Sequence, residues 1–131
     1  MYIHLKLIGV LLMLLAFLHT GFPKYFNWKK ELPNLSLINK QMMEVHTFFL
    51  AFVLFLIGLL CFLSTNEIIE TNLGKTLSFG LAIFWFVRLL FQFFVYSPKL
   101  WKGKRFETIM HVLFTLLWGY LSAVFFIIFL N

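Results

Sequence analysis

Four long runs of apolar residues dominate the chain, and the polar residues gather in the stretches between them. At about 1.5 Å of rise per residue, each run forms a helix that can cross a hydrocarbon layer roughly 30 Å thick. The pattern therefore predicts an all-α integral membrane protein, folded as one four-helix bundle over residues 1–131. We expect the four transmembrane helices at about residues 3–19, 45–63, 77–96 and 108–130.

Glycine and proline mark where two of these helices are expected to end. Gly21 and Pro23 follow the first run, and Ser97 with Pro98 is expected to close the third, because proline cannot continue the helical hydrogen-bond ladder. A signal peptide is the competing interpretation of the first run. The run ends without a cleavage site flanked by small residues, which favours a retained helix.

The third run carries an arginine well inside its apolar stretch. At about 100° per residue, Arg88, Gln92 and Tyr96 share one stripe of the helix with Leu81 and Trp85. A charge deep in a bilayer costs roughly 2.5–3.5 kcal/mol on insertion scales. Arg88 is therefore expected to face other helices, where another group must balance its positive charge.

The fourth run has a polar stripe of its own, spread over about 80° of arc. Its members are Glu107, His111, Thr115, Trp118 and Ser122. The short loop between the third and fourth runs requires antiparallel neighbours, so Gln92 is expected level with His111. Trp85 and Trp118 are then expected to close the base of a polar pocket.

Composition supports a membrane environment: 62% of the residues are hydrophobic and only 12% are charged, about half the charged fraction of a soluble domain. The net charge of +6 does not indicate nucleic-acid binding, because the positive residues lie in loops rather than on a basic face. The single cysteine, Cys61, excludes an intrachain disulfide framework. The abundance of Phe, Ile, Lys and Asn is typical of a bacterium with an AT-rich genome.

The distribution of positive charge predicts the orientation. The stretches after the first and third runs hold eight lysines and arginines, and the opposite side holds only Lys6 and Lys75. The eight are Lys24, Lys29, Lys30, Lys40, Lys99, Lys102, Lys104 and Arg105. By the positive-inside rule these residues lie in the cytoplasm, so we predict a multi-pass protein of the bacterial inner membrane with both termini extracytoplasmic.

This topology places three of the four histidines at the cytoplasmic level of three different helices. His19 ends the first helix, His46 begins the second and His111 lies just inside the fourth. The predicted cofactor-binding pocket opens toward the cytoplasm and consists of His19, His46, Arg88, Gln92, Tyr96 and His111.

Several ligands suit these side chains. Imidazole binds zinc, copper and haem iron, so His19, His46 and His111 are the predicted metal ligands. Haem b would use one or two of the histidines, with Arg88 beside its propionates, and a quinone or lipid headgroup could use the same groups. Glu44 and His46 lie about 200° apart on a helix, which weakens a carboxylate-bridged di-metal site. Arg88 could also form a structural ion pair with Glu107 or Glu44.

In outline the chain is similar to small bacterial membrane proteins associated with haem, such as the HemJ-type protoporphyrinogen oxidases. The shared features are four helices, a histidine at the end of the first helix and an arginine inside the membrane. The resemblance implies a helical membrane fold and an association with haem, and it assigns no role to any residue.

Three functions remain compatible with the sequence. The first is a membrane protein that binds haem, another metal or an organic cofactor, in a redox or electron-transfer role. The second is an accessory or structural subunit of a larger membrane complex, and the third is a small oligomeric transporter or channel. The expected partners are the lipid bilayer together with other membrane proteins or further copies of this chain.

Overall fold

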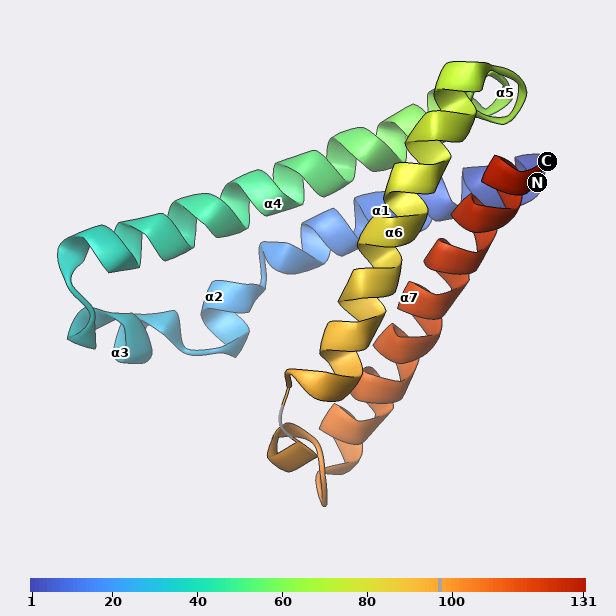
Figure 1. Ribbon diagram of the computed structural model, residues 1–131. Helices are drawn as coiled ribbons and strands as arrows, with labels where there is room; N and C mark the ends of the chain where they lie inside the picture. Colours follow the sequence, from blue (N-terminus) through green and yellow to red (C-terminus); the bar gives the residue numbers. More distant parts are fainter. Residues whose placement is uncertain (97) are drawn as a thin grey trace. The chain divides into compact units, whose positions relative to one another are not determined.

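The structure, a computed structural model, describes residues 1–96 and 98–131. Ser97, which was expected to close the third helix together with Pro98, lies outside the described residues. The described chain is helical and contains no strand. It forms two compact units, one from Ile3 to Thr65 and one from Asn66 to Asn131 with Met1–Tyr2 (Figure 1). The prediction of an all-α fold is confirmed.

Within the described residues, four helices are long and apolar enough to cross a membrane. They are α1 (Tyr2–His19), α4 (Leu37–Leu63), α6 (Asn72–Phe94) and α7 (Arg105–Leu130). Only 17% of the most apolar window of α4 is buried, so most of its apolar side chains are exposed. The four helices agree with a multi-pass membrane protein.

Two of the long helices begin earlier than their apolar runs. The Ser36 hydroxyl caps α4 by accepting a hydrogen bond from the Asn39 amide at 3.4 Å, ahead of the expected start near residue 45. The Thr71 hydroxyl caps α6 by accepting from the Gly74 amide at 2.9 Å, ahead of residue 77. Polar first turns are helical here because a cap satisfies their free N–H groups.

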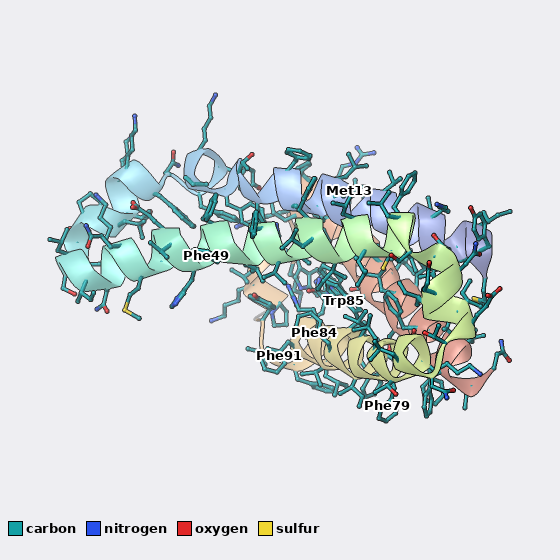
Figure 2. All side chains as sticks on the ribbon, turned by 90° about the horizontal axis from the view of Figure 1, so that it is seen from above. Met13, Phe49, Phe79, Phe84, Trp85 and Phe91 are labelled. Carbon is teal, nitrogen blue, oxygen red and sulfur yellow. The ribbon has the colours of Figure 1, made fainter. Side chains whose placement is uncertain are left out.

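In the unit Ile3–Thr65, α1 and α4 run antiparallel and side by side (Figures 1 and 2). They come closest at Gly9 and Gly58, where a Cβ atom added to either glycine would lie 2.7 Å from the carbonyl oxygen of the other. Met13 also packs against this crossing. Small residues allow membrane helices to approach closely, and these two glycines do so here.

In the same unit, Lys6 of α1 contacts the last turn of α4. The Lys6 ammonium donates a hydrogen bond to the carbonyl oxygen of Phe62 and lies 4.4 Å from the centre of the Phe62 ring. Phe62 belongs to the last turn of α4, whose carbonyl groups have no partner within the helix. The lysine thus satisfies a carbonyl at the negative end of the helix dipole.

Short helices connect α1 to α4: α2 (Phe22–Tyr25), α3 (Trp28–Glu31) and the 3₁₀ turn η1 (Leu32–Asn34). Asn27 lies between α2 and α3 with φ 54° and ψ 49°, a left-handed conformation that asparagine adopts more readily than most residues. Trp28 and Leu32 are buried and hold this connection in place.

In the second unit, α6 and α7 form an antiparallel hairpin (Figure 1). A short helix, α5 (Thr65–Glu70), precedes α6, and the 3₁₀ turn η2 (Pro98–Leu100) lies in the connection to α7. The Ser122 hydroxyl donates to the Ala82 carbonyl at 3.0 Å, which ties the two helices together. The phenylalanines of α6, among them Phe79, Phe84 and Phe91 in Figure 2, are exposed.

Candidate functional site

Five side chains gather where the polar stripes of α6 and α7 meet. We call them the Arg88 cluster: Arg88, Gln92, Tyr96, His111 and Trp118. Arg88 and Gln92 are one helical turn apart on α6, so they project to the same side of the helix. The antiparallel hairpin brings His111 level with Gln92, as the sequence register predicts.

The positive charge of Arg88 is surrounded by aromatic rings and one amide. Its guanidinium carbon lies 5.0 Å from the centre of the Trp118 ring and 5.3 Å from that of Tyr96. Its Nη1 donates to Gln92 Oε1 at 3.4 Å. Among the described residues of this unit, no carboxylate pairs with Arg88, so the expected alternative of an ion pair with Glu107 is not observed. The rings stabilise the cation without neutralising it.

The Gln92 amide determines how His111 is protonated. Arg88 can only donate, so Gln92 Oε1 faces it and the amide nitrogen faces His111. Gln92 Nε2 lies 3.2 Å from His111 Nδ1 and 3.4 Å from the His111 carbonyl oxygen. Because an amide nitrogen also only donates, Nδ1 accepts, and the neutral ring carries its proton on Nε2.

The connection between α6 and α7 holds the His111 ring from one side. The Trp101 indole stacks on it, with ring centres 4.6 Å apart and an angle of 18° between the planes. The Thr108 hydroxyl donates to the Trp101 carbonyl at 2.6 Å and thereby fixes this connection to the first turn of α7. His111 is therefore oriented by Gln92 and Trp101 together.

Two buried indoles form the base of the cluster, as the sequence predicted. Trp85 and Trp118 are only 3% and 5% exposed, and their rings stack 5.2 Å apart at an angle of 5°. Neither Nε1 has a hydrogen-bond partner within the described part of the chain. A buried N–H group without a partner costs about 1–3 kcal/mol. The cluster thus combines one full positive charge with N–H donors that the protein itself does not satisfy.

The predicted pocket residues fall into both units. Arg88, Gln92, Tyr96 and His111 come together as described, with Gln92 buried and Tyr96 at the exposed edge. His19 belongs to the unit Ile3–Thr65, where its Nδ1 donates to the Leu15 carbonyl at 2.8 Å and its ring packs 4.5 Å from that of Phe22. A carbonyl only accepts, so Nδ1 carries the proton and Nε2 keeps its lone pair.

His46, the third predicted metal ligand, is exposed on α4. The helix continues through both Glu44 and His46, so the two side chains project to different faces. Within residues 1–96 and 98–131, no three His, Cys, Asp or Glu side chains lie close enough together to hold a metal ion. The metal set of His19, His46 and His111, with its members in different units, stays a prediction.

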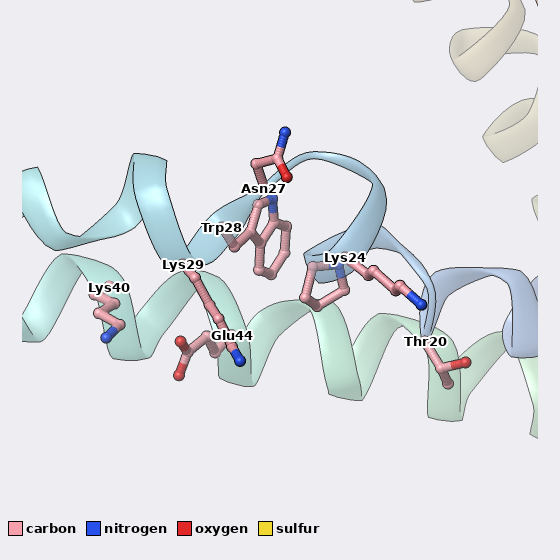
Figure 3. A pocket seen from close by; sticks show the side chains of 8 residues that line it. Thr20, Lys24, Asn27, Trp28, Lys29, Lys40 and Glu44 are labelled. Carbon is pink, nitrogen blue, oxygen red and sulfur yellow. The ribbon is translucent and has the colours of Figure 1, made fainter.

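Sequence reasoning did not find a polar cavity in the unit Ile3–Thr65. It is lined by Thr20, Pro23, Lys24, Asn27, Trp28, Lys29, Lys40 and Glu44 (Figure 3). The sequence pattern predicts the start of the second helix near residue 45. In the structure α4 begins at Leu37, so Lys40 and Glu44 lie one turn apart on it.

Comparison with known proteins gives no relative from which a function could be inferred, so the function is argued from the chemistry of these residues. No protein-family model, no curated protein and no solved structure matches the chain. What the described residues provide is a half-buried arginine without a carboxylate, two buried indole N–H groups without partners, and a histidine oriented by a buried amide.

Proposed function

We propose that the protein is a multi-pass membrane protein that binds an organic ligand at the Arg88 cluster, through an anionic or acceptor-rich group of that ligand. The observation that carries this proposal is the environment of Arg88. Its charge is met by two rings and an amide, and by no carboxylate of its own unit as described. An arginine withdrawn in part from solvent normally has a countercharge, and a ligand can supply it.

The donors of Arg88 favour the same class of ligand. Arginine has five N–H donors in a planar fork, and among the described residues only one of them is recorded in a hydrogen bond. An anionic oxygen group, such as a carboxylate or phosphate, accepts several hydrogen bonds from such a fork at once, so it suits Arg88 better than an apolar ligand.

Haem is the sharper form of the proposal. Its propionates suit Arg88, while haem iron or another His-bound metal would supply redox or electron-transfer chemistry. His111 would hold a metal poorly, because Gln92 keeps Nδ1 as an acceptor and the ring proton on Nε2. His19, whose Nε2 keeps its lone pair, and exposed His46 would be better metal ligands within their own unit.

We further propose that the protein lies in the bacterial inner membrane with both termini extracytoplasmic. Support comes from charge, since eight positive residues flank one pair of helix ends and two flank the other. In this orientation the His111 end of the α6–α7 hairpin faces the cytoplasm, and the Arg88 cluster opens toward it.

The test is the chemical content of the purified protein. Wild-type protein in mild detergent is examined by oxidised and reduced absorption spectra, by elemental analysis, and by mass spectrometry of its organic extract. We expect a stoichiometric anionic molecule that Arg88→Gln loses and Arg105→Gln retains, since exposed Arg105 begins α7 outside the cluster. A wild-type protein without any such molecule, or equal retention in both variants, would overturn the proposal.

A second function is favoured by the same arginine. The countercharge could come from a carboxylate on a helix of a neighbouring subunit, in which case the chain is an accessory subunit or a member of an oligomeric transporter or channel. The largely unburied α4 offers a surface for such packing. Crosslinking in native membranes separates the alternatives, because a bound small molecule with only monomer would exclude them.

A further inference from the structure

The connection between α1 and α4 borders a half-open cavity that the proposed function does not use. It has a volume of about 610 Å³ and lies between the α2–α3 segment and the first turns of α4 (Figure 3). All of its lining residues belong to the unit Ile3–Thr65. We call it the Lys24 cavity and define it by its lining: Thr20, Pro23, Lys24, Asn27, Trp28, Lys29, Lys40 and Glu44.

Two local features form this cavity: the turn at Asn27 and the early start of α4. Left-handed Asn27 reverses the chain between α2 and α3, and its carbonyl oxygen accepts from the amides of Lys30 and Glu31 at 2.9 and 3.0 Å. The Trp28 indole, only 9% exposed, anchors the segment. Because Ser36 caps α4 early, the helix turns that carry Lys40 and Glu44 are already formed opposite this segment.

The lining is strongly basic. Three lysines, Lys24, Lys29 and Lys40, and one carboxylate, Glu44, line the cavity, so the lining carries a formal net charge of +2. None of the three ammonium groups has a hydrogen-bond or ion-pair partner within the described part of the chain. Each ammonium has three donors, so the cavity presents many more donors than acceptors.

The position of the cavity indicates where its ligand comes from. The Lys24 cavity lies at the C-terminal end of α1 and beside the polar first turns of α4, where two apolar helices leave the hydrocarbon layer. Exposed Tyr25 and Phe26 flank it, as aromatic residues do at the headgroup level. The exposed apolar side chains of α4, such as Phe49 in Figure 2, continue from there toward the membrane interior.

We propose that the Lys24 cavity binds the phosphate group of an anionic phospholipid, with the acyl chains lying along the apolar surface of the α1–α4 pair. Basic pockets beside membrane helices on the cytoplasmic side bind such headgroups. Lysine binds phosphate as a point charge, and three of them suit the spread-out charge of a headgroup. The proposal needs α1 and α4 to be in a membrane, but it does not depend on any ligand at the Arg88 cluster.

Lipid binding can be counted directly. Full-length protein is released from nanodiscs that contain equal amounts of phosphatidylglycerol and phosphatidylcholine, and native mass spectrometry measures the lipids that stay bound. We expect one phosphatidylglycerol in preference to phosphatidylcholine. Lys24→Gln, Lys29→Gln and Lys40→Gln should each weaken this preference about five-fold, and Glu44→Gln should strengthen it by a similar factor.

The control removes three positive charges elsewhere, in Lys102→Gln/Lys104→Gln/Arg105→Gln. All three of these residues are exposed around the start of α7. We expect this triple variant to retain the lipid preference of the wild type. Equal losses in the control and in the cavity variants would show general surface attraction and would overturn the proposal.

Two further outcomes decide the source of the phosphate. Inorganic phosphate is titrated into the lipid-free protein in detergent, and thermal stability is recorded. If the wild type shows no preference for phosphatidylglycerol but millimolar phosphate stabilises it through Lys24 and Lys40, the ligand is a soluble phosphate compound and the lipid assignment is wrong. Should a lysine variant fail to fold by circular dichroism, the expected gain in Glu44→Gln still tests the proposal.

Discussion

The positive charge of Arg88 is stabilised by aromatic rings and an amide, which do not neutralise it. Two aromatic rings at 5.0 and 5.3 Å and one long hydrogen bond to Gln92 give a cation–π environment of moderate strength. The same hydrogen bond orients the Gln92 amide, which in turn makes His111 Nδ1 an acceptor. At the scale of single residues, one charge therefore sets the direction of a chain of hydrogen bonds across two helices.

Gln92→Glu tests whether the cluster is built for an acceptor ligand. The new carboxylate would lie one turn from Arg88 and would supply the countercharge that a ligand otherwise provides. We expect the amount of co-purifying anionic molecule to fall about ten-fold, while the melting temperature stays above that of Gln92→Leu. Quantitative extraction and thermal unfolding measure the two effects. An unchanged ligand content in Gln92→Glu would contradict the proposed function.

Gly9→Ala tests the closest approach of α1 and α4. A Cβ atom there would lie 2.7 Å from the carbonyl oxygen of Gly58, so the helices must separate, at a cost of about 1–3 kcal/mol in the free energy of unfolding. Gly80→Ala is the matched control, because a Cβ atom at Gly80 meets nothing within 4 Å. That control should be neutral or stabilise the protein by up to about 1 kcal/mol. Unfolding in mixed detergent measures both, and equal effects would refute the tight crossing.

At the scale of elements, each unit is a pair of antiparallel helices held by a different device. Glycines allow α1 and α4 to approach, whereas α6 and α7 are joined by stacked tryptophans and by the hydrogen bond from Ser122 to the Ala82 carbonyl. In a lipid environment the hydrophobic effect does not drive helices together, so close packing and polar contacts such as these hold the pairs. A Cβ atom added at Gly80 or Gly119 would meet nothing within 4 Å, so neither glycine is needed for the approach of α6 and α7.

Ser122→Ala measures the polar contact of the α6–α7 hairpin. We expect a loss of about 0.6 kcal/mol in the free energy of unfolding, the average for hydrogen bonds between membrane helices. Ser78→Ala is the comparison, since the Ser78 hydroxyl donates to the Gly74 carbonyl of its own helix at 2.8 Å. A carbonyl within a helix keeps its backbone partner, so this second variant should change the free energy less. A larger loss in Ser78→Ala would show that Ser122 does not join the two helices.

At the scale of the whole molecule, the uneven distribution of charge is the feature with the widest consequence. Eight positive residues follow α1 and α6, and three of them line the Lys24 cavity. The same asymmetry that predicts the orientation of the chain thus also supplies the lysines of the proposed lipid site.

Cysteine labelling in cells tests the orientation. In a Cys61→Ala background, which removes the one native thiol, single cysteines replace Glu67 near the start of α6 and Lys102 before α7. We expect a membrane-impermeant maleimide to label Glu67→Cys in intact spheroplasts and Lys102→Cys only after permeabilisation. The opposite pattern would place the termini in the cytoplasm and invert the proposed topology.

The sequence by itself determined those features that depend on local period and length. Apolar runs long enough to cross a bilayer specify helices, and the spacing of Arg88 and Gln92 places them on one stripe of α6 whatever the helix packs against. The register of Gln92 with His111 follows from a short loop between antiparallel helices. These features were confirmed because periodicity and loop length leave little freedom.

Only the tertiary structure decided which surfaces meet. Gly9 and Gly80 are the same residue in apolar helices, yet one lies against a carbonyl and the other in open space, because the difference lies in the partner helix. The Lys24 cavity likewise needs the turn at Asn27 and the early start of α4 to bring Lys24 and Lys40 to one place. Such contacts join residues far apart in the chain, and hydrophobic period carries no information about them.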